Sequence, residues 1–232
     1  MNSPTLLIMP RGRYPKRLYS IDIDQETLRR YKLDWQNKEL YSHPEKFAPV
    51  TVKELFGVDK KFAIEIGCGD GQFLCTLAKR ERNICFLGIE AIGKLSDIAV
   101  SNAAKDSLPN IRFLRADLRL IAPLFLSETV NDFYLHFPAP FSSKRELNRQ
   151  TYSKEILLHV HRALVVGGRL SFITDDKPAF DFVSKEAREI EGFHRVDEKD
   201  YQLVLEDDLK STYHKYWERK GRAIYRTEFE KG

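Results

Sequence analysis

The sequence contains no apolar run of the length that a membrane-spanning helix requires, which is about 20 residues. The early run Leu6–Met9 is short and Pro10 follows it, so we expect no secretory signal peptide. Cysteine is rare, and the spacing of Cys68, Cys75 and Cys85 forms no paired metal-binding motif. We therefore expect reduced thiols, no metal and a cytoplasmic protein.

Internal repeats and low-complexity tracts are also missing. A chain of 232 residues with 42% hydrophobic side chains is expected to form one domain with an extension. We place the boundary at residue 50, with a basic extension and a short helix in residues 1–50 and a larger domain in residues 51–232. The composition and the motifs do not distinguish a monomer from a homodimer.

The net charge of +4 is modest, but the basic residues gather at the two ends of the chain. Residues 1–20 contain four basic residues and no acidic residue, and residues 209–232 contain seven basic residues against three glutamates. Tyrosine and tryptophan lie among these charges. Such mixtures are typical of surfaces that bind an RNA backbone and unstacked bases. An ordinary solvated surface is the alternative interpretation.

The most informative segment is the run from Ala63 to Gln72, in which a short apolar stretch leads into Gly67, Gly69 and Gly71. An amphipathic pattern follows over residues 73–80, so the segment predicts a strand, a tight turn and a helix. Glycine is needed where the backbone has a positive φ or lies against a ligand. At the carboxyl edge of a parallel sheet, such a turn predicts a nucleotide-like ligand.

The residues around the turn narrow the choice of ligand. Gln72 stands where the dinucleotide fingerprint needs its third glycine. Acidic residues accompany the turn instead, because Glu65 precedes it and Asp70 lies within it. Carboxylates suit a ligand that has no phosphate and carries a positive charge. S-adenosylmethionine (AdoMet) is such a ligand, with a sulfonium, an ammonium and two ribose hydroxyls.

Two further apolar runs also end in an acid. Residues 84–89 lead into Glu90, at roughly the 20-residue distance where a ribose-binding carboxylate ends the second strand. Residues 111–116 lead into Asp117, which is placed to receive the adenine amino group. Turn glycines and strand-capping acids of another α/β protein are the alternative. Three successive strands that each end in an acid favour an AdoMet-binding site over this alternative. The arrangement resembles the class I AdoMet-dependent methyltransferases over about residues 60–175.

Strand and helix patterns alternate from residue 62 onward, which predicts an α/β fold with a doubly wound, Rossmann-like sheet that is mostly parallel. The predicted strands are 62–66, 84–90, 111–116, 130–136 and 169–174, and the predicted helices are 52–56, 71–82, 93–106, 119–126, 151–164 and 178–191. We expect a further short helix capped by Asp24, and we expect Gly167 and Gly168 to end the helix over 151–164. The resemblance to methyltransferases, rather than periodicity, implies a C-terminal antiparallel strand pair near 200–206 and 222–227.

A stiff loop follows the strand 130–136, because two prolines flank Ala139 in the run Phe137–Phe141, before Lys144 and Arg145. This loop, together with the segments 173–175 and 227–230, resembles the tRNA (guanine-N7-)-methyltransferase family. That family has Phe-Pro-Asp-Pro-Trp before basic residues, Thr-Asp after a late strand, and Thr-x-x-Glu near the C-terminus. The resemblance covers about residues 55–232.

The resemblance implies an enzyme that transfers a methyl group from AdoMet to N7 of a guanine in tRNA, the variable-loop guanosine in this family. It implies that the cofactor-binding residues are Glu65, Gly67, Gly69, Gly71, Glu90 and Asp117. It implies that the substrate-binding residues are Lys144, Arg145, Asp175, Thr227 and Glu230. Of these, Asp175 and Glu230 are the predicted catalytic residues. The expected partner is tRNA, and no membrane or metal is expected.

The chain departs from the family pattern at Ala139, where the family has an acid, and at Phe141 and Ser143. Guanine N7 has a lone pair and no proton, so its direct attack on the methyl group needs no general base. The loss of the acid nevertheless leaves two alternatives open: a methyltransferase of this fold that acts on another RNA or a small molecule, or a catalytically weak RNA-binding paralogue. Asp175 could equally be a helix N-cap, and residues 227–230 an ordinary tail.

Overall fold

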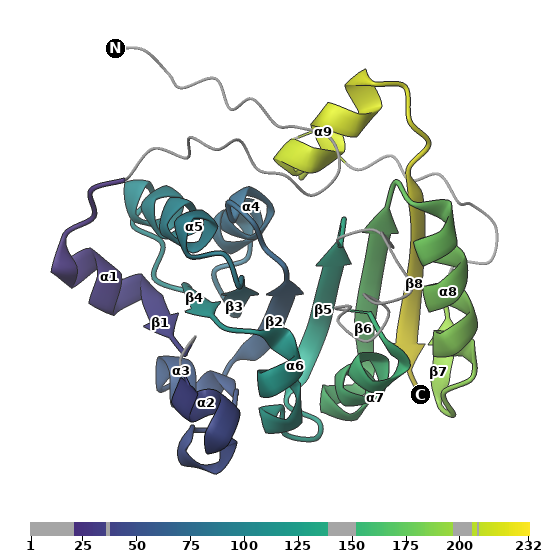
Figure 1. Cartoon of the computed structure of the whole chain (residues 1–232), viewed down its shortest axis with the longest axis horizontal. Helices are drawn as coiled ribbons and strands as arrows, with labels where there is room; N and C mark the ends of the chain where they lie inside the picture. Colours follow the sequence, from purple (N-terminus) through teal and green to yellow (C-terminus); the bar gives the residue numbers. More distant parts are fainter. Residues whose placement is uncertain (1–20, 36–37, 139–151, 197–205, 208) are drawn as a thin grey trace.

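A computed structural model of the chain describes residues 21–35, 38–138, 152–196, 206–207 and 209–232. Within these residues the strands form one sheet in the order β1-β4-β3-β2-β5-β6-β8-β7 (Figure 1). The strands are β1 (Lys32–Asp34), β2 (Lys61–Ile66), β3 (Ile84–Ile89), β4 (Ile111–Arg115), β5 (Val130–His136), β6 (Leu164–Thr174), β7 (Phe193–Arg195) and β8 (Tyr225–Lys231). The strand β8 pairs antiparallel with β6 and with β7, and the other strand pairings in the described residues are parallel. The predicted fold class is confirmed.

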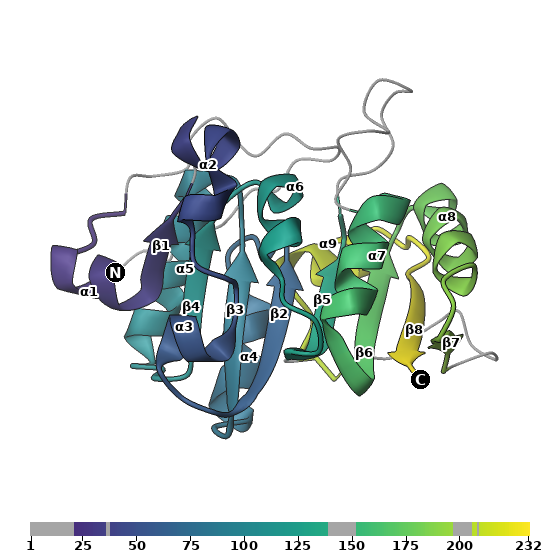
Figure 2. The ribbon, with the colours of Figure 1, turned by 90° about the horizontal axis from the view of Figure 1, so that it is seen from below.

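Helices cover both faces of the sheet (Figure 2). They are α1 (Gln25–Tyr31), α2 (Lys38–Ser42), α3 (Val52–Phe56), α4 (Gln72–Arg80), α5 (Gly93–Lys105), α6 (Leu118–Ile121), α7 (Lys154–Ala163), α8 (Lys177–Arg188) and α9 (Thr212–Arg219), with short 3-10 turns at Pro44–Lys46 and Ala122–Leu124. Val100 of α5 belongs to one buried apolar cluster with Phe113 of the sheet. Leu157 of α7 belongs to a second cluster with Phe172. Apolar residues on both faces explain why the central strands are nearly continuous hydrophobic runs.

The strand order places the carboxyl end of β2 at the point where the chain changes direction across the sheet. From β2 the chain passes through α4 to β3 and on to β4 on one side, whereas β5 and β6 lie on the other side. Ligands of doubly wound folds bind in the crevice at such a switch point, outside the carboxyl ends of the strands. The segment that contains the glycine turn directly follows β2 and therefore lies at this crevice.

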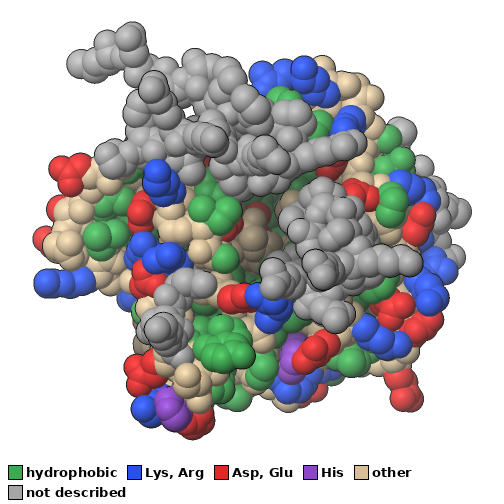
Figure 3. Space-filling model, in the orientation of Figure 1, with side chains coloured by type: hydrophobic (Ala, Val, Ile, Leu, Met, Phe, Trp, Pro, Cys, Tyr) green, Lys and Arg blue, Asp and Glu red, His purple; other side chains and the backbone are tan. Residues whose placement is uncertain are grey.

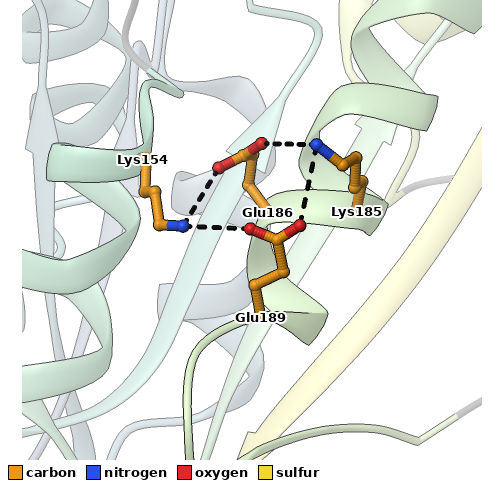
Figure 4. Close-up of polar contacts among 4 residues, drawn as sticks. All are labelled: Lys154, Lys185, Glu186 and Glu189. Carbon is orange, nitrogen blue, oxygen red and sulfur yellow. Dashed lines mark hydrogen bonds and ion pairs between the residues drawn. The ribbon is translucent and has the colours of Figure 1, made fainter.

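An exposed ion-pair network connects α7 with α8 (Figure 4). Lys154 Nζ lies 3.0 Å from a carboxylate oxygen of Glu189 and 3.6 Å from one of Glu186. Lys185 contacts the same two carboxylates at 3.6 and 3.5 Å. Exposed pairs of this kind contribute little to stability. The burial of Leu157 and Phe180 from these two helices stabilises their packing more strongly.

Two predicted boundaries are wrong near the glycine pair and the C-terminus. The helix α7 ends at Ala163, and Gly167 and Gly168 lie inside β6 instead of ending the helix. Gly167 has a φ of 76°, and the pairing of β5 with β6 shifts register here, so the glycines permit an irregular strand. The strand predicted at 200–206 falls largely outside the described residues, while β7 is found earlier and β8 later than expected.

The predicted division at residue 50 does not coincide with a break in the sheet. Asp24 caps α1 as predicted, by accepting from the backbone N–H of Thr27 at 2.8 Å. The chain then forms β1, which pairs with β4 at the edge of the same sheet, and Lys32 forms an ion pair of 2.7 Å with Asp97 of α5. The strand β1 therefore belongs to the same sheet as the strands after residue 50. Among the described residues, no helix is both long enough and apolar enough to span a membrane.

Candidate active site

The glycine turn has the backbone conformation that its sequence predicts. Gly67, Gly69 and Gly71 have φ values of 72°, 56° and 69°, in the left-handed region that favours glycine. The N–H of Gly67 donates to the carbonyl of Ile89 at 2.8 Å, which holds the turn against the end of β3. A Cβ at Gly71 would lie 2.8 Å from Cβ of Ala99, so the packing of α5 also excludes a side chain there.

Glu90 ties the turn to the end of β3. Its two carboxylate oxygens accept from the backbone N–H of Gly69 at 3.0 Å and of Ile92 at 2.8 Å. Burial raises the pKa of Glu90, and these two hydrogen bonds partly offset that rise. Each carboxylate oxygen has a second lone pair, so the side chain can also accept from the hydroxyl groups of a ribose.

Glu65 is a buried acid that faces the same crevice from β2. Only 4% of the residue is exposed, and its Oε2 has no hydrogen-bond partner among the described residues. Burial, followed by the charges of Asp70 and Glu90, raises its pKa well above the usual value. A buried carboxylate without a partner is unfavourable, and a cationic ligand would relieve it. This environment fits the sulfonium and ammonium groups of AdoMet.

Asp117 lies after β4, and its carboxylate forms hydrogen bonds with Arg119. It is the N-cap of α6, and its Oδ1 accepts from the backbone N–H of Arg119 at 3.0 Å and from its Nε at 2.9 Å. The ion pair with Arg119 lowers the pKa of Asp117. The backbone of Glu90 donates to the carbonyl of Leu114 at 3.1 Å, so Asp117 follows the strand beside Glu90. Its predicted contact with adenine stays a prediction.

Asp175 lies just past the carboxyl end of β6, at the same edge of the sheet. The alternative role as a helix N-cap is wrong, because Asp176 caps α8 by accepting from the N–H of Ala179 at 3.2 Å. The carboxylate of Asp175 instead accepts from Arg222 Nη1 at 2.6 Å.

The structure does not bring Thr227 and Glu230 to this edge. Thr227 is fully buried, and it pairs with Phe172, so it shares the face of the sheet that α8 covers. Glu230 pairs with Arg169 near the opposite end of β6, and its carboxylate accepts from Arg169 Nε at 2.8 Å. The direction of β8 is the physical reason, because Tyr225 alone in this strand reaches the level of Thr174. Residues 139–151, with Ala139, Lys144 and Arg145, lie outside the described part of the chain.

Sequence reasoning missed the helix α9, which lies above the carboxyl edge of the sheet (Figure 1). Thr212 Oγ1 donates to Asp70 in the glycine turn at 2.9 Å. His214 is buried, with its ring 5.4 Å from that of Phe137 at the start of the proline loop. Trp217 is also buried. Ser211 as an N-cap before an amphipathic run was the available signal, but the aromatic residues there were interpreted as an RNA-binding surface.

A cavity of about 250 Å³ extends along the face of the sheet next to α4. It is lined by Phe73 of α4, Tyr134 and His136 of β5, and Arg226 and Glu228 of β8, among others. Burial lowers the pKa of His136 to about 3, so its imidazole is neutral at physiological pH. No group of three or more His, Cys, Asp or Glu side chains in the described segments could hold a metal ion.

Comparison with known proteins places this geometry in a family. Residues 59–227 match the family described as "Putative methyltransferase". The tRNA (guanine-N(7)-)-methyltransferase of Chloroherpeton thalassium is 33% identical over 93% of this chain and 96% of its own length. The protein of that name from Chloroflexus aurantiacus is 36% identical over 93% of this chain and 95% of its own. Both relatives therefore match along nearly their whole length.

Solved structures show the same fold at lower sequence identity. The 16S rRNA methyltransferase KamB superposes with a TM-score of 0.58 at 16% identity, over 78% of this chain and 92% of its own. The aminoglycoside resistance methyltransferase NpmB1 has a TM-score of 0.56 at 22% identity, with the same coverage.

The glycine turn at the switch point of a mostly parallel sheet, with buried acids at the ends of β2 and β3, defines a Rossmann-like methyltransferase. The identity to the two curated relatives then narrows the class. The chain belongs to the tRNA (guanine-N(7)-)-methyltransferase family. The predicted family and enzyme class are confirmed, and AdoMet is the cofactor of this family of methyltransferases.

Proposed function

We propose that this protein transfers the methyl group of AdoMet to N7 of a guanine in tRNA. The observation that carries the proposal is the glycine turn with the buried acids Glu65 and Glu90 beside it, in a chain that is 33–36% identical to relatives named for this reaction. The variable-loop guanosine as the target nucleotide is part of the proposal and derives from the family resemblance. A tRNA substrate also suits a cytoplasmic location.

The cofactor is held by the turn and by the acids around it. Glu65 supplies a negative charge for the cationic end of the cofactor, and Glu90 accepts from the ribose hydroxyls. The left-handed glycines let the backbone approach the ligand without a Cβ in the way. Asp117 receives the adenine amino group at the end of β4. AdoMet supplies an electrophilic methyl group on its sulfonium.

The acceptor needs to be placed rather than activated. The lone pair of guanine N7 forms the new bond to carbon as the carbon–sulfur bond breaks, and the positive charge moves to the purine. Asp175 is placed at the correct edge of the sheet to bind the guanine and to stabilise that charge. His136 is neutral and buried, so it adds no competing positive charge near the purine. Thr227 and Glu230 are not part of this arrangement.

The tRNA is held by basic side chains around the crevice. Lysine and arginine side chains gather at the end of α9 (Figure 3), where the sequence contains Arg219 and Lys220, and Lys215 lies one turn earlier in the helix. Lys144 and Arg145 in the proline loop add to this surface in the proposal. Phosphate contacts of this kind release counterions, so the affinity for tRNA should fall steeply with salt.

The test is a methylation assay with unmodified tRNA and AdoMet labelled on the methyl group. We expect 7-methylguanosine after nuclease digestion and chromatography, at a single position of the tRNA. A parallel reaction with ribosomal RNA examines the alternative of another RNA substrate, which the Ala139 substitution keeps open. AdoMet that binds in calorimetry without any 7-methylguanosine in tRNA would contradict the proposal and favour another substrate or a weak RNA-binding paralogue.

A further inference from the structure

The side chain of Thr212 connects α9 to the glycine turn and to the start of α4. Its Oγ1 lies 2.9 Å from Oδ2 of Asp70 and 3.0 Å from Oε1 of Gln72. A hydroxyl has one proton, so it donates to the carboxylate and accepts from the Gln72 amide when the amide nitrogen faces it. Asp70 lies between two glycines with left-handed backbones. The contact therefore acts on the most constrained part of the turn.

Asp70 is held from two further directions. Its backbone carbonyl accepts from Asn102 Nδ2 of α5 at 3.0 Å, and its Oδ1 accepts from the N–H of Gln72 at 3.3 Å. With these contacts, α5 fixes the main chain of Asp70 and the hydroxyl of Thr212 adds a tie to α9. Asp70 and Thr212 are 142 positions apart in the sequence. Of the described residues, Thr212 alone links the side chain of Asp70 to α9.

Other residues on and just after α9 contact Phe137, Ile173 and Asp175, which follow or end the strands β5 and β6. The ring of His214 lies 5.4 Å from that of Phe137, which begins the proline loop. Trp217 packs with Ile173 in a small buried cluster under α9. The guanidinium of Arg222 covers the Trp217 ring at 4.1 Å and pairs with Asp175. Thr212 of α9 thus contacts the glycine turn and His214 of α9 contacts Phe137, while Arg222 just after the helix holds Asp175.

We propose that Thr212 is a positioning residue, through which occupation of the cofactor site orders α9 and aligns the substrate side of the site. AdoMet that fits against the turn fixes Asp70, and Asp70 then holds the first turn of α9 through the Thr212 hydroxyl. His214 and Arg222 follow because they lie on or directly after the same helix. This inference rests on the proposed cofactor site, but it does not depend on the identity of the RNA.

The first experiment measures hydrogen exchange in the full chain with and without AdoMet. Wild type should show slower exchange both in the glycine turn and in α9 when AdoMet is bound. Thr212→Val keeps the side-chain shape but loses the hydroxyl, so AdoMet should protect the turn and no longer protect α9. Thr212→Ser keeps the hydroxyl and should restore the wild-type pattern. Thr76→Val is the matched control, because Thr76 donates to the Gln72 carbonyl at 3.0 Å within α4, and among the described residues no hydrogen bond joins it to α9.

The second experiment separates positioning from cofactor binding. In Thr212→Val, kcat/KM for tRNA at saturating AdoMet should fall about tenfold, as expected for one lost hydrogen bond to a charged acceptor. The Kd for AdoMet should rise by no more than the same factor, because the coupling between the turn and α9 is reciprocal. AdoMet that fails to bind wild type would overturn the proposed function as well as this inference. AdoMet that binds wild type without protecting α9, or that protects α9 equally in Thr212→Val, would overturn this inference alone.

Discussion

Arg222 Nη1 lies 2.6 Å from Asp175 Oδ2, so the carboxylate predicted to bind the guanine is paired with a residue just after α9. The side chain of Arg222 is 43% exposed and that of Asp175 is 16% exposed. A partly exposed pair of this kind contributes little to the stability of the fold. Its effect is instead on orientation, because the pair fixes the carboxylate at the edge of the sheet.

Arg222→Ala should lower kcat/KM for tRNA by about tenfold, because a carboxylate that rotates freely loses part of its alignment with the guanine. The Kd for AdoMet should not change, since in the described part of the chain the side chain of Arg222 pairs with Asp175 and Trp217 and forms no hydrogen bond or ion pair with the glycine turn. Asp175→Asn should lower kcat/KM at least as strongly. Arg29→Ala removes the same charge from α1 and serves as the control in the same steady-state assay. If Arg222→Ala keeps full activity while Asp175→Asn does not, the pair is not needed for alignment.

Glu90→Ala should weaken AdoMet binding by about tenfold or more, because a hydrogen bond to a charged group contributes roughly 1.5–3 kcal/mol. Glu90 also accepts from two backbone N–H groups, so Glu90→Gln provides a gentler variant that keeps one acceptor oxygen. Calorimetry with AdoMet measures both. Glu45→Ala removes an exposed carboxylate far from the site and is the control. An unchanged Kd in both Glu90 variants would rule out its role in ribose binding.

Gly71→Ala and Gly57→Ala form a matched pair, because both glycines have a φ of 69°. Alanine at either position should cost about 1–2 kcal/mol for the left-handed backbone. At Gly71 the new Cβ also meets Ala99 at 2.8 Å, whereas at Gly57 nothing lies within 4 Å. Gly71→Ala should therefore lose about 1–3 kcal/mol more in denaturant unfolding, and should lose AdoMet binding as well. Equal unfolding free energies for the two variants would contradict the close packing of the turn against α5.

Local patterns predicted many of the helices and strands, and the bounds of α3 and β5 are those that the sequence indicates. The buried acids Glu65 and Glu90 were also found, because strand ends and glycine turns are local features. The positions of Thr227 and Glu230 were not found, because the face and height of a residue on β8 depend on its register with β6. A slip of one residue would reverse every side chain of that strand.

Contacts between distant segments could not be predicted either, because they also depend on how the elements pack rather than on local sequence patterns. The hydroxyl of Thr212 meets Asp70 only because α9, which precedes the last strand, lies above the turn after β2. No periodicity encodes that placement. The helix α1 was expected from its cap at Asp24, but β1 was missed because a strand of three residues has too few positions to show alternation.

Glu65→Gln should stabilise the unliganded protein at neutral pH and weaken AdoMet binding. Burial raises the pKa of Glu65, so the folded state holds its proton more tightly than the unfolded state. The free energy of unfolding therefore falls as pH rises from the usual glutamate pKa through the raised pKa. Glutamine does not ionise, so Glu65→Gln should not lose stability in this pH range. Each 1 kcal/mol of stability corresponds to about 2–4 °C in Tm for a chain of this size.

Thermal melts of wild type and Glu65→Gln across the acidic to neutral range measure the effect. The two Tm curves should meet at acidic pH, where Glu65 is protonated in both states, and diverge toward neutral pH. Glu54→Gln changes a glutamate in α3, away from the site, and should leave the pH dependence intact. If the Tm at neutral pH is lower in Glu65→Gln than in wild type, the buried carboxylate of Glu65 does not destabilise the unliganded protein.

Ala139→Asp tests whether the proline loop retains the geometry of its family. Position 139 lies between Pro138 and Pro140, two residues after Phe137, whose ring contacts His214 of α9. If the site is a weakened version of the family's site, the new carboxylate should add electrostatic support for the charge on the purine and raise kcat on tRNA. Ala139→Asn, which has nearly the same shape without the charge, should give a smaller gain.

The readout is the initial rate of 7-methylguanosine formation under saturating AdoMet, with wild type and both variants in parallel. Direct attack by N7 needs no base, so wild type should already be active and the acid should change the rate rather than create it. A loop that has been reshaped for a different acceptor would make the carboxylate neutral or harmful. A lower rate in Ala139→Asp, with unchanged AdoMet affinity, would therefore reject the weakened-site interpretation and favour another substrate for this member of the family.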